Sequence, residues 1–149
     1  MPRPFLAFIL LTLPALTLAQ APEPPPDHRH LVEMPTLQRE LLREEMQEHL
    51  IAYQRILELL ARGELAQAGE MAENTMGIST MGKHAAATRG LGGPGRFMPD
   101  AMRQMGFAMH ESATEFAKVA EQGDLQEALK ALHELTATCV ACHMSFRTR

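Results

Sequence analysis

The sequence lacks any run of alternating β-branched residues, and this absence argues against a fold built on β-strands. It has no tryptophan, and its two cysteines both lie in one short motif near the C-terminus. Of its 149 residues, 46% are hydrophobic and 21% are charged. These proportions are typical of one ordinary globular domain, and the chain is too short to form two good cores.

The sequence also lacks an excess of positive charge, because it has 14 Lys and Arg residues and 18 Asp and Glu residues. Nucleic acid is therefore not an expected partner, since binding to phosphates needs a clustered positive surface.

The first residues have the order of a secretory signal peptide. Arg3 precedes an unbroken apolar run over residues 5–13, and small residues come after it. The run is shorter than the roughly 20 residues that a membrane-spanning helix needs, and Pro14 lies directly behind it. We predict cleavage after Ala19, export to the periplasm and no stable membrane anchor after cleavage. Loss of Arg3 with the leader would leave a formal net charge of about −5.

The mature chain is predicted to begin with a disordered, proline-rich tail over residues 20–35. Prolines remove backbone hydrogen-bond donors there, and no apolar residues recur. From Thr36 onward the pattern changes to apolar residues three and four positions apart, which predicts a helix up to Arg62 and Gly63.

Three more helices are expected. A weaker helix starts at Leu65, and a glycine-rich connection over residues 88–96 comes after it. Pro99 begins the third helix and Gly123 ends it, while Asp124 and Glu127 resemble a capping box for the fourth. Four amphipathic helices with mostly short connections predict an all-α, antiparallel up-and-down four-helix bundle over residues 36–149.

The chemistry is concentrated in the last predicted helix, where Cys139-Val140-Ala141-Cys142-His143 has the spacing of a haem-attachment motif. Cysteines three residues apart lie on one side of a helix, so both can form thioether bonds to the edge of one porphyrin. His143, four residues after Cys139, projects from the same side, where its imidazole can reach the iron. We predict one covalently bound haem c.

Three alternatives compete with this interpretation. A redox-active disulfide of the thioredoxin type belongs in a βαβ context, which the sequence lacks. A structural zinc site needs two further ligands at a regular spacing, and only scattered histidines are present. A structural disulfide between Cys139 and Cys142 would close a very small loop and cross-link little.

The motif near the C-terminus of an all-helical chain, with Phe146 and Arg147 just beyond it, resembles the class II cytochromes c, which comprise the cytochromes c′ and their low-spin relatives. The resemblance implies a four-helix bundle with haem between the last helix and the others. His143 would be the proximal iron ligand, and the first helix would face the distal side.

In that family the distal residue comes after an Arg-Gln pair of the first helix. It is a methionine in low-spin electron carriers and an apolar residue in five-coordinate proteins. Here Arg43-Glu44-Glu45-Met46 stands in that place, a departure of about one residue. Met46 is the expected distal ligand, and His49 is the alternative on the same helix. Arg43 and Arg147 are candidates for pairing with haem propionates, because a guanidinium binds a carboxylate in a bidentate way.

Two functional classes remain at this point. One is a one-electron carrier that docks weakly to redox partner proteins. The other is a five-coordinate protein that binds nitric oxide or carbon monoxide. No arrangement of a nucleophile and a base can be argued from the spacing, so we do not expect an enzyme. The family resemblance alone suggests a homodimer.

Overall fold

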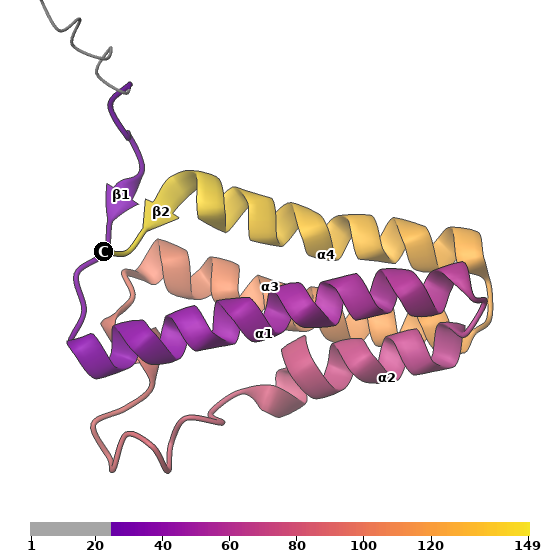
Figure 1. Cartoon of the computed structure of the whole chain (residues 1–149), viewed down its shortest axis with the longest axis horizontal. Helices are drawn as coiled ribbons and strands as arrows, with labels where there is room; N and C mark the ends of the chain where they lie inside the picture. The colour runs from indigo at the N-terminus through magenta and orange to yellow at the C-terminus, as the bar shows by residue number, and fades with distance from the viewer. Residues whose placement is uncertain (1–24) are drawn as a thin grey trace, which may run out of the picture.

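The computed structural model describes residues 25–149 and confirms an all-α four-helix bundle (Figure 1). The predicted signal peptide and the first residues of the predicted tail lie outside the described residues. No described helix combines the length and apolar character needed to cross a membrane. The four helices are α1 (Thr36–Ala61), α2 (Leu65–Met76), α3 (Asp100–Glu121) and α4 (Leu125–Ser145).

Two glycines and one side-chain cap mark helix ends at the residues predicted from the sequence. Gly63 (φ +75°) and Gly123 (φ +80°) adopt the left-handed conformation after α1 and α3, so each chain reversal is short. The Asp124 carboxylate accepts hydrogen bonds from the backbone N–H groups of Gln126 and Glu127, which have no partner within the helix. Successive helices are therefore antiparallel.

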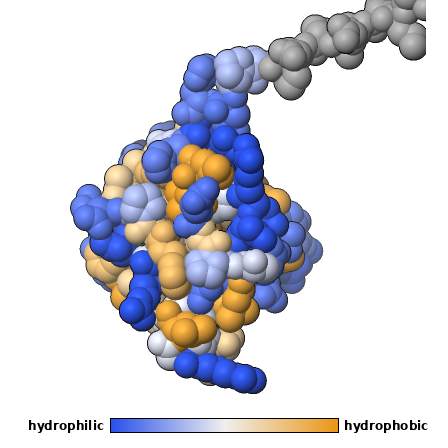
Figure 2. All heavy atoms as spheres, turned by 90° about the vertical axis from the view of Figure 1, so that its left-hand side faces the viewer, coloured by the Kyte–Doolittle hydropathy of each residue, from blue (hydrophilic) through white to orange (hydrophobic). Residues whose placement is uncertain are grey.

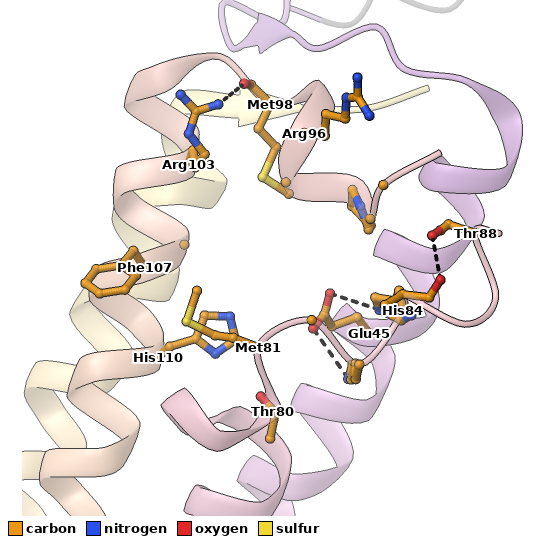
Figure 3. Close-up of a pocket in the computed structure, with 18 of the residues that line it drawn as sticks. Glu45, Thr80, Met81, His84, Thr88, Arg96, Met98, Arg103, Phe107 and His110 are labelled. Atoms are coloured by element: carbon orange, nitrogen blue, oxygen red, sulfur yellow. Dashed lines mark hydrogen bonds and ion pairs between the residues drawn. The ribbon is translucent and has the colours of Figure 1, made fainter. Parts of the chain in front are cut away.

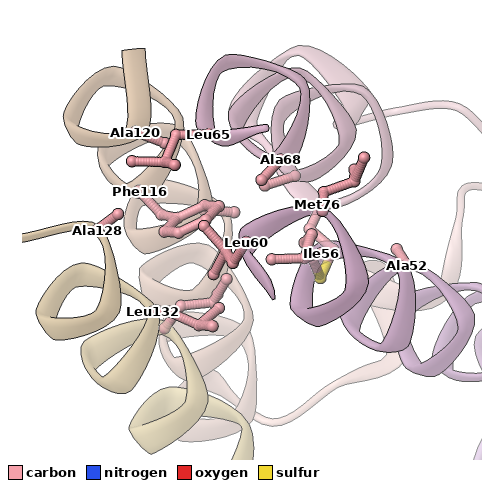
Figure 4. Packing of buried hydrophobic residues seen from close by; sticks show 14 of the residues in the cluster. Ala52, Ile56, Leu60, Leu65, Ala68, Met76, Phe116, Ala120, Ala128 and Leu132 are labelled. Carbon is pink, nitrogen blue, oxygen red and sulfur yellow. The ribbon is translucent and has the colours of Figure 1, made fainter. Parts of the chain in front are cut away.

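The hydrophobic core draws residues from all four helices, and α2 and α3 approach closely within it (Figure 4). Alanines at the interface, such as Ala68 and Ala120, are fully buried, and Phe116 fills the space between them and α1. A Cβ atom at Gly69 would lie 2.8 Å from the carbonyl oxygen of Ala117. Gly69 is therefore required by this close approach, although glycine lowers helix propensity by about 1 kcal/mol.

The buried face of α1 differs from the predicted stripe. Leu37, Leu50 and Leu57 belong to the apolar residues three and four positions apart that predict this helix, but they are 44%, 71% and 44% exposed. The residues that the core covers are Gln38, Leu42, His49, Ala52, Ile56, Leu59 and Leu60. For Leu50 the reason is that α1 packs on α2, whereas the side of α1 toward α4 borders a cavity.

The long connection between α2 and α3 consists of turns and two short 3₁₀ helices, η1 (Ile78–Thr80) and η2 (Pro94–Phe97). The predicted glycine-rich connection is confirmed as a region without α-helix, and Gly90 and Gly92 adopt positive φ there. The Gln38 amide donates a hydrogen bond to the Gly92 carbonyl oxygen at 3.2 Å and so ties this connection to α1.

The disordered tail predicted up to residue 35 is wrong from His30 onward. Strand β1 (His30–Leu31) pairs in parallel with β2 (Phe146–Arg147), and Val32 is buried. Pairing with Phe146 and Arg147 gives the backbone N–H and C=O groups of this segment hydrogen-bond partners, whereas the predicted tail would expose them to solvent. Figure 1 shows this pair at one end of the bundle, beside the C-terminus.

We expect Asp124→Ala to lower the free energy of unfolding by about 1 kcal/mol, because two N–H groups at the start of α4 would lose their acceptor. Urea denaturation followed by circular dichroism measures the change. Asp100→Ala is the matched control, since that carboxylate pairs with Arg103 on the surface and caps no helix. Equal stability of Asp124→Ala and the wild type would contradict the capping role.

Candidate functional site

The C-terminal half of α4 brings the predicted haem-attachment residues to one cavity. Cys139, Cys142 and His143 all border it, as their spacing of three and four residues along a helix predicts. Both cysteines are half-buried free thiols, and His143 lies in the last turn of the helix. The structure therefore brings together the three residues that the sequence selected.

The cavity has a volume of about 610 Å³ and lies between α1, α3 and α4. That volume falls in the usual range for sites of small molecules and cofactors. Its walls are mainly apolar. Besides the motif they include Met46, Gln47, His49, Leu50 and Tyr53 from α1, Met76 from α2, Met105, Gly106 and Met109 from α3, and Leu135, Thr136, Thr138 and Val140 from α4.

One hydrogen bond closes the inner end of the cavity. The Thr136 hydroxyl of α4 donates to the Leu132 carbonyl oxygen at 2.7 Å, so its oxygen is free to accept from the Tyr53 hydroxyl of α1, 3.2 Å away. Within residues 25–149, no other hydrogen bond joins α1 to α4. Leu50 and Val140, which are 71% and 51% exposed, lie at the outer side of the cavity.

Met46 and His49 both line the wall that α1 contributes, so the structure places both candidate distal residues at the same cavity as His143. Met46 and Cys142 both pack against a small apolar cluster of Val32, Leu42 and Met102. His49 is 9% exposed, and its Nε2 atom is buried without a hydrogen-bond partner.

Burial also determines the charge of His49. Desolvation lowers its pKa to about 4, because the imidazolium form would lose its hydration among apolar groups. The nearby Glu45 carboxylate opposes this effect without cancelling it. His49 is therefore neutral at pH 7, and its ring meets that of His110 edge to face at 6.5 Å between centroids.

Burial raises the pKa of both motif thiols, and the proximity of Cys139 adds to the effect at Cys142. The thiols are therefore protonated at neutral pH. In the described part of the chain, no three His, Cys, Asp or Glu side chains are arranged to hold a metal ion. The zinc alternative thus gains no support from residues 25–149.

The two arginines proposed as propionate partners do not line the cavity. Arg43 pairs with Glu40 on the surface of α1 at 3.2 Å. Arg147 lies 3.3 Å from the Asp27 carboxylate and donates to the backbone oxygen of Arg29 at 3.4 Å. Their proposed role at the propionates stays a prediction.

A second cavity of about 740 Å³ lies between α1, the α2–α3 connection and the first half of α3 (Figure 3). Glu45 and His84 lie on one side of it, 3.4 Å apart, and Phe107 and His110 lie on the other. It contains no residue of the cysteine motif. The predicted haem-attachment residues therefore border only the smaller cavity, although Gly106 borders both cavities.

Several residues that shape the smaller cavity could not be recognised from the sequence. Tyr53, Met105 and Met109 follow the helical apolar period, so they look like ordinary core residues in sequence. Thr136 carries no sequence signal at all. Only the packing of α4 beside α1 shows that Thr136 and Tyr53 meet.

The residues of this cavity fit a covalently bound haem. Two thiols and an imidazole lie on one wall, a thioether and a neutral imidazole lie on another, and the remaining surface is largely apolar. The unpartnered Nε2 of His49 is a buried polar atom for which the protein itself provides no partner. These are the types of donor that hold iron in haem proteins.

A four-helix bundle with a Cys-x-x-Cys-His motif in its last helix is typical of small helical c-type cytochromes. Residues 98–147 match the family model described as Cytochrome C′, from the start of α3 through the motif to β2. This match confirms the resemblance to the class II cytochromes c and supports a c-type cytochrome. Searches of curated proteins and of solved structures give no match.

The buried, neutral His49 makes stability depend on pH. In the unfolded chain this imidazole binds a proton below a pKa of about 6.5, whereas in the fold it does so only below about 4. The unfolded state is therefore favoured as the pH falls from about 6.5 to about 4, by at most about 3 kcal/mol.

We expect His49→Leu to remove this part of the acid sensitivity, because leucine stays buried and does not titrate. Urea denaturation at about pH 7 and about pH 4 measures the loss of stability in each variant. His133→Gln, a change at an exposed position of α4, should behave as the wild type does. An equal loss in His49→Leu and the wild type would refute the assignment.

Proposed function

We propose that the protein is a periplasmic c-type cytochrome that holds one haem in the cavity between α1, α3 and α4. Cys139 and Cys142 would form the two thioether links, and His143 would be the proximal iron ligand. The observation that carries the proposal is that these three residues share one apolar cavity with Met46 and His49 on the facing helix. The family match over α3 and α4, which includes the motif, also supports a c-type cytochrome.

One-electron transfer is the function that this arrangement favours. The bound haem would supply an iron that alternates between the ferrous and ferric states. Met46 is the preferred distal ligand, since it lies on the side of α1 toward the cavity and its thioether would raise the reduction potential. The apolar walls exclude water, which limits rearrangement of solvent when the charge changes.

Docking to redox partner proteins would use the surface around the outer side of the cavity. Leu50 and Val140 border the cavity, and Ile51 and Met144 are exposed on the same two helices. Apolar groups at an exposed site suit small, short-lived interfaces. Export by the predicted signal peptide would place the protein in the periplasm, where covalent attachment prevents loss of haem. We propose no catalytic role.

A gas-binding protein is the second candidate, and the second cavity favours it. Gly106 borders both cavities, and a Cβ atom at this position would meet nothing within 4 Å. A gap at this glycine would give a small neutral molecule, such as nitric oxide or carbon monoxide, a way toward the distal side. The charged groups nearby would offer little obstacle, because Glu45 is paired with Lys83 and His84.

Covalent attachment is tested by the mass of protein produced in a host that attaches haem. We expect one added haem that remains after acid–acetone extraction. Cys139→Ala with Cys142→Ala should lose the haem on the same treatment, while Thr138→Ala, a neighbouring change at the cavity, should retain it. A wild-type chain with its bare polypeptide mass and no colour would refute the proposal.

The distal ligand separates the two candidate functions. If Met46 binds iron, the wild type has a low-spin spectrum indifferent to carbon monoxide, and Met46→Leu becomes high-spin and binds the gas. His49→Leu is the matched control on the same wall and should keep the wild-type spectrum. A wild type that is already high-spin and shifts with carbon monoxide would favour the gas-binding protein. Loss of the low-spin spectrum in His49→Leu alone would instead identify His49 as the ligand.

A further inference from the structure

The segment before α1 lies against the residues just beyond the haem motif. His30 pairs with Phe146 and Leu31 with Arg147 in a parallel register, and the two aromatic rings of His30 and Phe146 meet edge to face at 5.9 Å. The Val32 N–H donates to the Arg147 carbonyl oxygen at 2.8 Å. The N-terminal segment thus holds the end of α4 from outside the bundle.

Charged groups reinforce this pairing at its outer edge. Asp27 lies 2.8 Å from Arg29 and 3.3 Å from Arg147, so one carboxylate joins the two segments. The Arg29 side chain reaches the carbonyl oxygen of His143 at 3.5 Å. These groups are mostly exposed, and exposed ion pairs contribute little to stability. The attachment therefore depends mainly on the backbone pairing described above and on apolar packing.

Val32 provides that packing. It is 4% exposed and forms a cluster with Leu42 of α1 and Met102 of α3. Met46, Cys142 and Phe146 are among the partly buried residues that pack against this cluster. Figure 2 looks onto this end of the molecule and shows apolar side chains gathered beside the hydrophilic N-terminal segment.

The position of this cluster gives it a role in the geometry of the site. Direct contacts between α1 and α4 are sparse, because the haem cavity lies between them. The Tyr53–Thr136 hydrogen bond joins the two helices at the inner end of the cavity, and the Val32 cluster joins them at the other. The distance between α1, which carries Met46, and α4, which carries His143, therefore depends on both of these contacts.

We propose that residues 27–34 form a clasp, and that Val32 is a positioning residue that fixes the end of α4 relative to α1. Val32 acts through Cys142, the residue before His143, on one side and through Met46 on the other. The clasp deepens the function proposed above and rests on it for the effect at the iron. Its effect on the end of α4 is independent of which distal ligand is present.

The experiment compares haem-loaded wild type with Val32→Ala, Val32→Ile and Leu60→Ala. Leu60 is as well buried as Val32, but it belongs to the main core and does not border the haem cavity. Leu60→Ala therefore destabilises the bundle without touching the clasp. Val32→Ile keeps an apolar β-branched side chain and should behave as the wild type does.

Hydrogen exchange of the amides of residues 140–147, followed by mass spectrometry, is the first measurement. We expect exchange at least about tenfold faster in Val32→Ala than in the wild type, with no selective change at this segment in Leu60→Ala. The second measurement is the absorption spectrum and the reduction potential. Val32→Ala should show a partly high-spin spectrum and a shifted potential, while Val32→Ile and Leu60→Ala should match the wild type.

Unchanged exchange and an unchanged spectrum in Val32→Ala would overturn the clasp, even if the wild type carries a low-spin haem. Equal effects of Val32→Ala and Leu60→Ala would also overturn it, since they would reflect general loss of stability. A wild type without covalent haem would refute the proposed function instead. In that case the exchange measurement still decides whether the clasp holds α4.

Discussion

The structure depends on keeping α1 and α4 apart while joining them firmly at both ends of the space between them. A bundle of four helices normally closes this space with interlocking side chains. Here a cavity of about 610 Å³ takes its place, and it is bordered by the three motif residues and both candidate distal residues. The Tyr53–Thr136 hydrogen bond joins α1 and α4 at one end of this cavity, and the cluster around Val32 joins them at the other.

The rigidity needed to maintain this cavity comes from the opposite side of the bundle. There α2 and α3 pack so closely that Gly69 faces the backbone of Ala117 directly, and buried alanines occupy much of the interface. Phe116 and Ile56, which are fully buried, connect this tight layer to α1. Close packing resists deformation, so three helices form a stable frame along which α4 is held.

Much of the fold and part of the site could be predicted from local sequence patterns. Gly63, Gly123 and Asp124 specify helix ends through backbone conformation and capping, which act over a few residues. The faces of α1 were less predictable, because an apolar residue such as Leu50 follows the same period whether it meets a helix or borders a cavity. The pairing of β1 with β2 was not predictable, since it joins segments at opposite ends of the chain.

By itself, the sequence determined the four helices and the placement of Cys139, Cys142 and His143 on one side of α4, because helical geometry fixes the direction of residues three and four positions apart. Only the tertiary structure decided what faces them. Met46 and His49 meet the same cavity as the motif, while Arg43 and Arg147 do not, because these positions depend on how separate helices and the N-terminal segment pack. Such packing is set by contacts between residues far apart in the chain, which no local pattern records.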